Sequence, residues 1–323
     1  MKIGTRSSAM ALAQTNDVAA RLLAAAPETS PEVSPFKPMG DVDQVSKLGR
    51  HGGKGGAFVA EIRAALRAGD LQAAMHSLKD VPGDEEAPGL IFGAHLPRES
   101  VADALVLKDG LSLDAFERDG AAGFKIGTNA VRRAAYLKRL YPNAEIIHYR
   151  GAADTRIRKL NEGAMQRLPD GGEVGPADAL IMAESGLGRV GLSEHIARTF
   201  SPSEMLPAVG QGIVVVECVA DDFETRRRLA AIDDKDARCA ADAEREMLWI
   251  LNGHCNAPIA GHAVIDGQRL RLDGAVLSLD GGSIVEASAE GEAAFPRAIG
   301  REVGLKLIAK GAAEIIASAE AAG

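Results

Sequence analysis

Basic side chains that could bind anions recur where a loop is predicted to enter or leave a helix. Arginine pairs with a carboxylate or phosphate through two parallel hydrogen bonds, and the N-terminus of a helix adds partial positive charge. Any one of these residues could instead be a solvated surface charge, but together they favour an anion-binding cleft. The set comprises Arg6, Lys54, Lys79, Arg132, Arg133, Arg150, Arg156 and Arg189.

A single acid, Asp80, stands just after a predicted strand at residues 71–75, within His76-Ser77-Leu78-Lys79-Asp80-Val81-Pro82. A carboxyl group in this place could act as a general acid or base. It could also be an ordinary turn residue, and taken alone the turn interpretation is favoured. The neighbouring Lys79 would favour the ionised carboxylate, whereas burial would raise its pKa.

The chain has three widely spaced cysteines, Cys218, Cys239 and Cys255. An odd number at such spacing argues against a disulfide framework and a four-ligand zinc site, so we expect no metal. Cys255 lies in a short loop between Gly253 and Pro258, where a thiol can be exposed. His254 is adjacent, but neighbouring side chains usually point apart, so a cysteine–histidine pair is not implied.

The elements that must position these residues change character along the 323-residue chain, which is long enough for two or three domains. Strand and helix signals alternate over the first ~220 residues, which indicates α/β layers with ligands outside the carboxyl ends of strands. From about Asp222, two helical stretches (223–232 and 237–251) lead to the Cys255 loop, alternating strands and a long helix from about Pro296. This part is typical of a separate α+β domain.

Composition excludes several classes of function. The net charge is −8 and aromatic residues make up 4% of the chain, so we expect no nucleic-acid binding. No apolar run approaches the ~18 residues that suggest a membrane span, and the N-terminus lacks the pattern of a secretory leader. We therefore expect a cytoplasmic protein with no membrane contact. The glycine-rich loop at residues 49–56 is not a phosphate-binding P-loop, so nucleotide binding has little support.

The motifs occur in an order that resembles the porphobilinogen deaminase family. The segment at residues 76–82 and the segment Leu206-Pro207-Ala208-Val209-Gly210-Gln211-Gly212 are very specific together. The resemblance runs from residue 3 into the C-terminal domain. Its other motifs are Ile3-Gly4-Thr5-Arg6-Ser7-Ser8, Gly127-Thr128 with Arg132-Arg133, Tyr149-Arg150-Gly151 with Thr155-Arg156, and Cys255 with Pro258-Ile259.

This resemblance implies an α/β fold with two lobes like those of type II periplasmic binding proteins, plus a smaller C-terminal α+β domain. Domain 1 is expected at residues 1–99 with 204–221, because a returning segment completes the first lobe. Domain 2 is expected at 103–200, and domain 3, which carries the cysteine loop, at 225–323. By the same resemblance we expect a monomer.

The resemblance also implies the chemistry, that of a hydroxymethylbilane synthase. Cys255 would carry a dipyrromethane cofactor through a thioether. Four porphobilinogen units would be added to it one at a time, each losing ammonia, before hydrolysis frees a linear tetrapyrrole. Each unit brings an acetate and a propionate, which a cationic cleft would hold. Loss of ammonia leaves a cationic azafulvene that Asp80 could stabilise before accepting a proton from the new ring.

Site residues follow from the same motifs, with Asp80 as the catalytic group. The residues implied to hold the cofactor, besides Cys255, are Lys54, Ser77, Lys79, Thr128, Asn129, Arg132, Arg133 and Arg150. The residues implied to bind porphobilinogen, the expected small-molecule partner, are Arg6, Ser8, Gln14, Arg156 and Arg189.

The sequence departs from the family pattern at four places. Asn129-Ala130 stands where two serines are usual, Ala152 replaces an asparagine, His254 replaces a glycine, and the glycine loop around Lys54 is one residue longer. These departures leave open a diverged paralogue that binds a tetrapyrrole or a small anion with little or no turnover. A binding protein without catalysis and a cysteine hydrolase are further alternatives, and the latter lacks a recognisable base for Cys255.

Overall fold

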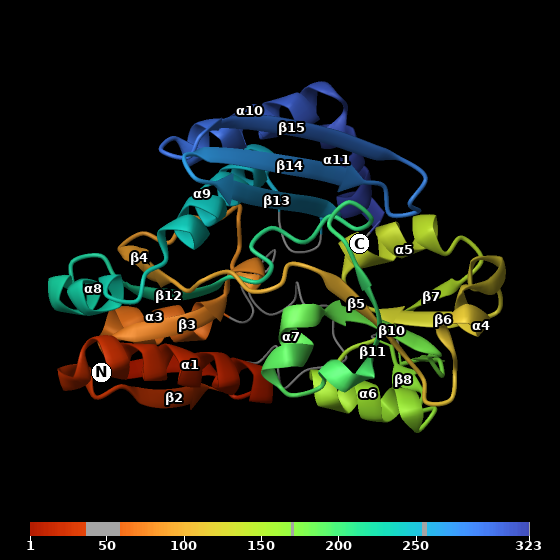
Figure 1. Ribbon diagram of the computed structural model, residues 1–323, viewed down its shortest axis with the longest axis horizontal. Helices are drawn as coiled ribbons and strands as arrows, with labels where there is room; N and C mark the ends of the chain where they lie inside the picture. Colours follow the sequence, from red (N-terminus) through yellow and green to blue (C-terminus); the bar gives the residue numbers. More distant parts are fainter. Residues whose placement is uncertain (37–58, 169–170, 254–256, 323) are drawn as a thin grey trace.

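The computed structural model describes residues 1–36, 59–168, 171–253 and 257–322. Its three larger sheets occupy three regions of the molecule (Figure 1). The predicted strand at residues 71–75 lies instead at 73–77, because pairing with the first strand begins at Ala73. Ser77 therefore still belongs to the strand, and only three residues separate its end from Val81.

The first sheet has the strand order β2-β1-β3-β12-β4. The strand β12 comes from a distant part of the chain and lies antiparallel to both of its neighbours. Ile3 and Leu22 belong to the core on one face of the sheet, and Ile62 and Leu66 to another buried cluster. The elements are β1 (Lys2–Arg6), α1 (Ala9–Ala25), β2 (Glu32–Phe36), α3 (Ala60–Ala68), β3 (Ala73–Ser77), β4 (Leu90–His95) and β12 (Val214–Val219).

The second sheet repeats this order as β7-β6-β10-β5-β11. Here the strand antiparallel to both neighbours is β5, which directly follows the segment that leaves the first sheet. The elements are β5 (Asp103–Leu107), α4 (Leu113–Glu117), β6 (Lys125–Thr128), α5 (Val131–Leu140), β7 (Glu145–His148), α6 (Ala153–Asn161), β10 (Ala179–Ala183), α7 (Glu184–Arg189) and β11 (Ile196–Phe200), with a short pair β8 (Gln166–Arg167) and β9 (Glu173–Val174).

Two segments, residues 96–102 and 201–213, connect these sheets. The side chain of Gln211, which is fully buried, donates to the carbonyl of Val101 over 2.6 Å and to a carboxylate oxygen of Asp103 over 3.1 Å. The two connections are therefore hydrogen-bonded to each other rather than independent tethers.

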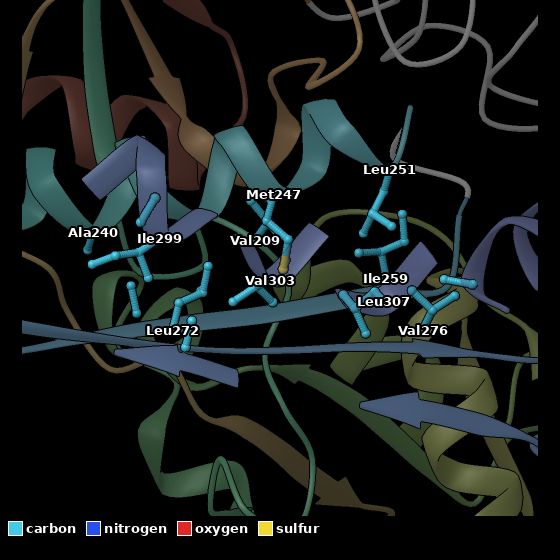
Figure 2. Packing of buried hydrophobic residues seen from close by; sticks show 14 of the residues in the cluster. Val209, Ala240, Met247, Leu251, Ile259, Leu272, Val276, Ile299, Val303 and Leu307 are labelled. Atoms are coloured by element: carbon cyan, nitrogen blue, oxygen red, sulfur yellow. The ribbon is translucent and has the colours of Figure 1, made fainter. Parts of the chain in front are cut away.

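The C-terminal part is a three-stranded antiparallel sheet of β13 (Ile259–Asp266), β14 (Arg269–Leu277) and β15 (Ile284–Glu292). Figure 2 shows Met247 of α9 (Lys235–Ile250) and Leu251, the residue that caps this helix, above the sheet, in one cluster with Ile259, Leu272 and Val303. The remaining helices of this part are α8 (Phe223–Ala230), α10 (Pro296–Ala309) and α11 (Ala312–Ala322).

A buried carboxylate joins this third part to the connections between the lobes. Glu244 of α9 is completely buried and accepts hydrogen bonds from the backbone of Gly210 and Ala263, each over 2.7 Å. The guanidinium of Arg98, in the connection at residues 96–102, lies 2.6 Å from the same carboxylate. A buried charge is tolerated only when it is paired and hydrogen-bonded, so these four groups have to stay together.

The predicted fold class is confirmed: two α/β lobes with the same strand order are followed by a smaller α+β domain. The expected domain limits remain predictions. Within the described residues, no helix combines the length and apolar character needed to cross a membrane.

Candidate active site

A cleft of about 610 Å³ lies between the two lobes. Its walls include the first turn of α1, the turn after β3, the first turn of α6 and most of α7. Ser8, Ala152 and Ala183, the N-cap residues of α1, α6 and α7, line it. The N-terminal ends of these three helices favour negative charge in the cleft. Ten residues predicted for the site line this cleft, namely Arg6, Ser8, Ser77, Lys79, Asp80, Asn129, Arg133, Arg150, Arg156 and Arg189.

Three other predicted residues support the cleft from behind. Gln14 is 4% exposed, and its amide nitrogen lies 3.0 Å from the hydroxyl of Ser77. The Thr128 hydroxyl accepts from the backbone of Ala130 over 3.2 Å. Arg132 is buried and donates to the carbonyl of Leu206. Lys54 and Cys255, the remaining two, lie outside the described residues.

The catalytic candidate Asp80 sits in a short turn that two buried contacts fix in place. Leu78, at the start of the turn, is 1% exposed and its N–H donates to the carbonyl of Ile213 over 3.0 Å. Gly210 packs so closely on Leu78 that a Cβ there would lie 2.7 Å from its Cγ. The carboxylate of Asp80 remains 44% exposed at the cleft, 4.0 Å from the guanidinium of Arg6.

Lys79 lies beside Asp80 in a crowded cationic environment. Burial and, after it, the positive charge of Arg133 lower the pKa of Lys79 to about 8, against the opposing effect of the carboxylates of Asp80 and Asp103. An ammonium with this pKa gives up part of its charge just above neutral pH. Binding an anionic ligand would restore the charge, because a nearby negative charge favours the protonated form.

Asp103 is a buried partner of two site arginines that sequence reasoning missed. It is completely buried at the start of β5 and lies 2.6 Å from Arg132 and 2.7 Å from Arg133. Burial alone would raise its pKa, but the charges and hydrogen bonds of the two arginines hold it well below its ordinary range. The signal was present in the sequence, since an aspartate heading the apolar run Ala104–Leu107 must have a charged partner if the run is buried.

Arg156 differs from the other cleft arginines because its Nε is buried without a hydrogen-bond partner among the described residues. Burial lowers its pKa to about 10, and the charge of Arg133 adds to the effect. It lies in the first turn and a half of α6, a helix whose N-cap Ala152 offers no side-chain acceptor or donor. Arg189, in contrast, is already paired with the carboxylate of Glu99 at 2.8 Å.

The charges of the lining decide which ligand fits. Six basic side chains and two acidic ones, Asp80 and Asp154, are found among the described lining residues. Arg133 and Arg189 are paired with carboxylates outside the lining, but the buried Nε of Arg156 is an unsatisfied donor within the described part of the chain. The excess of basic side chains therefore favours a ligand that carries carboxylates.

Comparison with known proteins identifies the family. Residues 1–227 match the family model "Porphobilinogen deaminase, dipyromethane cofactor binding domain", and residues 238–309 match "Porphobilinogen deaminase, C-terminal domain". A porphobilinogen deaminase of Syntrophobacter fumaroxidans is 39% identical over 98% of this chain and 96% of its own length. Porphobilinogen deaminase 2 of Streptomyces coelicolor is 38% identical over the same shares.

Solved structures with a similar chain path are more distant. The periplasmic VFT2 domain of Bordetella pertussis BvgS is 14% identical, with a TM-score of 0.40, over 72% of this chain and 85% of that one. A marine TRAP solute binding protein is 12% identical with a TM-score of 0.41, and 99% of each chain is covered. Neither bears on what this chain binds.

The two family models and the near-full-length relatives confirm the resemblance that the motifs predicted. They also account for the cationic cleft, since a dipyrromethane and the pyrroles added to it carry acetate and propionate groups. The chain belongs to the porphobilinogen deaminase family, the transferases that assemble hydroxymethylbilane from porphobilinogen on a dipyrromethane cofactor.

Proposed function

We propose that the cleft performs this reaction with Asp80 as the catalytic carboxylate and Cys255 as the attachment point of the cofactor. The observation that carries the proposal is the position of Asp80: an exposed carboxylate held in a rigid turn, facing a cleft whose other charges are mostly positive. Such a group stabilises a cation that develops in the cleft, while the surrounding cations bind the carboxylates of the same ligand.

Substrate binding falls to the arginines of the cleft rim and the second lobe. Porphobilinogen carries an acetate and a propionate on its pyrrole ring, and guanidinium groups bind such carboxylates in pairs of hydrogen bonds. We assign this role to Arg6 and Arg156, with support from Ser8 and Gln14. The unpartnered Nε of Arg156 gains a partner when a carboxylate arrives, and Arg189 would have to exchange Glu99 for the substrate.

Asp80 then acts twice in each addition. The bond between the aminomethyl carbon and its nitrogen breaks, the nitrogen leaves as ammonia, and the positive charge that remains on the pyrrole is stabilised by the Asp80 carboxylate. After the methylene carbon has bonded to the terminal ring, Asp80 accepts the proton that this ring carbon loses. When bound, the dipyrromethane supplies the ring carbon at which the chain begins to grow.

The remaining candidates, which come from both lobes, would hold the cofactor carboxylates. The same cleft as Asp80 is lined by Ser77, Lys79, Asn129, Arg133 and Arg150, and Thr128 supports the turn before α5 through the backbone of Ala130. Arg132 lies behind this wall and shares Asp103 with Arg133, so we assign it the task of orienting Arg133. Lys54 is proposed from its sequence position alone.

Of the four departures that leave open a paralogue with little turnover, two involve residues that line the cleft, Asn129 and Ala152. An asparagine still offers a donor to a carboxylate, and Ala152 leaves backbone N–H groups at the start of α6 open to an anion. These positions therefore remain compatible with carboxylate binding.

We further propose a cytoplasmic monomer. A sedimentation mass near twice 33.7 kDa would contradict the monomer.

The test compares Asp80→Asn with the parent protein and with Asp70→Asn, a matched change at an exposed position of the same lobe. Each is incubated with porphobilinogen, and the released ammonia and tetrapyrrole are measured. We expect Asp80→Asn to lower kcat by about 10²–10³ and Asp70→Asn to leave it within about two-fold. Parent protein that releases no ammonia would favour the paralogue, and full activity in Asp80→Asn would overturn the assignment of Asp80.

A further inference from the structure

The C-terminal half of α9 contacts the turn that carries Asp80. The guanidinium of Arg245 donates to the carbonyl of Pro82 over 2.9 Å and, more weakly, to that of Val81 over 3.4 Å. Its central carbon also lies 5.4 Å from the centre of the Phe92 ring. The carbonyl groups of Val81 and Pro82, one and two residues after Asp80, are thus held by a helix of the third domain as well as by their own lobe.

Leu248, three residues further along the same helix, lies between two glycines from different parts of the chain. A Cβ built on Gly83, just beyond the Asp80 turn, would lie 2.2 Å from Leu248 Cδ2 and 3.4 Å from the carbonyl oxygen of Gly253. A Cβ built on Gly253 would lie 2.6 Å from Leu248 Cδ1 and 2.4 Å from Ile259 Cδ1. Neither glycine has a positive φ, so space, and not backbone conformation, requires glycine at both positions.

The helix that presents these side chains is itself firmly held. Glu244 accepts four hydrogen bonds in the buried junction, two from Arg98 and one each from the backbone of Gly210 and Ala263. Met247 is completely buried against the third sheet (Figure 2). The backbone N–H of Gly253 donates to the carbonyl of Leu248 over 2.9 Å, so the segment that leaves α9 starts in a defined direction.

We propose that Leu248 and Arg245 are positioning residues that set the place of the Asp80 turn relative to the segment leading to Cys255. Leu248 acts as a spacer between Gly83 and Gly253, and Arg245 fixes the peptide groups next to Asp80. The inference rests on the proposed roles of Asp80 and of Cys255, which follows Gly253 by two residues in the sequence. Its consequence is that one turn of α9 fixes the spacing between the Asp80 turn and Gly253, from which the chain continues towards Cys255.

The sharpest test adds and removes volume at the spacer. Gly83→Ala forces Leu248 or the turn to move, and a displacement of about 1 Å near reacting groups can lower a rate by about 10². We expect kcat to fall 10- to 100-fold, as roughly estimated from that effect, with KM within about two-fold because the binding arginines are untouched. In Gly83→Ala with Leu248→Ala the new methyl group occupies the vacated space, so kcat recovers at least several-fold over Gly83→Ala alone.

A second pair of variants keeps the test independent of that packing change. Arg245→Met removes the contacts to Val81 and Pro82, and we expect kcat to fall about ten-fold. Arg238→Met is the matched control, because Arg238 is on the same helix and donates to the carbonyls of Phe92 and Gly93, away from Asp80. We expect it to retain kcat within about two-fold while losing a similar amount of thermal stability.

Three results would overturn the proposal: no recovery in the double variant, equal kcat in the two arginine variants, or activity losses that track only the folded fraction. The intact mass of each variant is measured in parallel, so that loss of the cofactor is separated from loss of its positioning. Failure of the proposed function itself would show differently, as a parent protein without cofactor mass or an Asp80→Asn variant with full turnover.

Discussion

Replacing Asp103 by asparagine removes one negative charge from the centre of the molecule. The parent carboxylate is completely buried and lies 2.6 Å from Arg132 and 2.7 Å from Arg133. Both guanidinium groups are buried as well, at 4% and 9% exposed. The variant therefore leaves two buried cations without a counter-charge, next to the already crowded Lys79.

The magnitude follows from this burial. Breaking a buried ion pair by removing one partner costs about 3–5 kcal/mol of folding free energy. For a cooperative unit of about 150–250 residues, such as the two lobes together, this lowers the melting temperature by roughly 6–20 °C. Because the pKa of Asp103 is depressed in the folded state, its contribution is present above the ordinary carboxyl pKa of about 4 and disappears only below it. The deficit should therefore be constant from pH 5 to pH 7 and narrow in acid.

Scanning calorimetry at pH 7 measures the effect, with Glu290→Gln as the control. Glu290 pairs with Arg269 at 2.7 Å across two strands, but both side chains are more than half exposed, so its loss should cost at most about 1 kcal/mol. Equal melting temperatures for Asp103→Asn and Glu290→Gln would refute the reasoning that burial makes the first pair indispensable. The same outcome would also remove the basis for assigning Arg132 an orienting role.

Three further predictions address other parts of the molecule. Lys79→Met should lower activity yet raise the free energy of unfolding at pH 7 by at most about 3 kcal/mol, because the parent folds with a lysine whose pKa is lowered to about 8. In melting curves from pH 7 to 10, the difference in stability between the variant and the parent should shrink as the lysine of the parent loses its proton. Glu244→Gln should cost about 3–5 kcal/mol by leaving the buried guanidinium of Arg98 unpaired, and denaturation at pH 7 measures it. Gly127→Ala should destabilise the second lobe by about 1–3 kcal/mol, since its Cβ would lie 2.9 Å from Tyr149, and hydrogen exchange in β6 would report the change.

Site residues that belong to a motif at the end of a strand were predicted correctly to reach the cleft. Asp80 and Lys79 follow β3, and Arg150 and Arg156 follow β7, so local signals were enough to place them at one edge of their sheets. The structure brings both pairs to the lining of one cleft between the lobes. The family resemblance, not periodicity, predicted that a returning segment joins the first lobe.

Pairings between distant residues could not be predicted in this way. Asp103 and Arg133 are 30 residues apart, and Arg98 and Glu244 are 146 residues apart. A charged residue in an apolar strand indicates that a partner exists, but the partner is known only after the chain has folded. Arg132 is an example. The motif predicted that it would bind the cofactor in the cleft, whereas in the structure its guanidinium donates to Leu206 and Asp103, behind the cleft lining.

The intact mass of the denatured protein shows whether Cys255 carries the cofactor. It is measured for the parent, for Cys255→Ser and for Cys239→Ser, a matched change at a partly exposed cysteine on α9. The account predicts the added mass of a dipyrromethane on the parent and on Cys239→Ser, and none on Cys255→Ser. A parent that stays unmodified after incubation with porphobilinogen, or a Cys255→Ser variant that keeps the added mass, would contradict it.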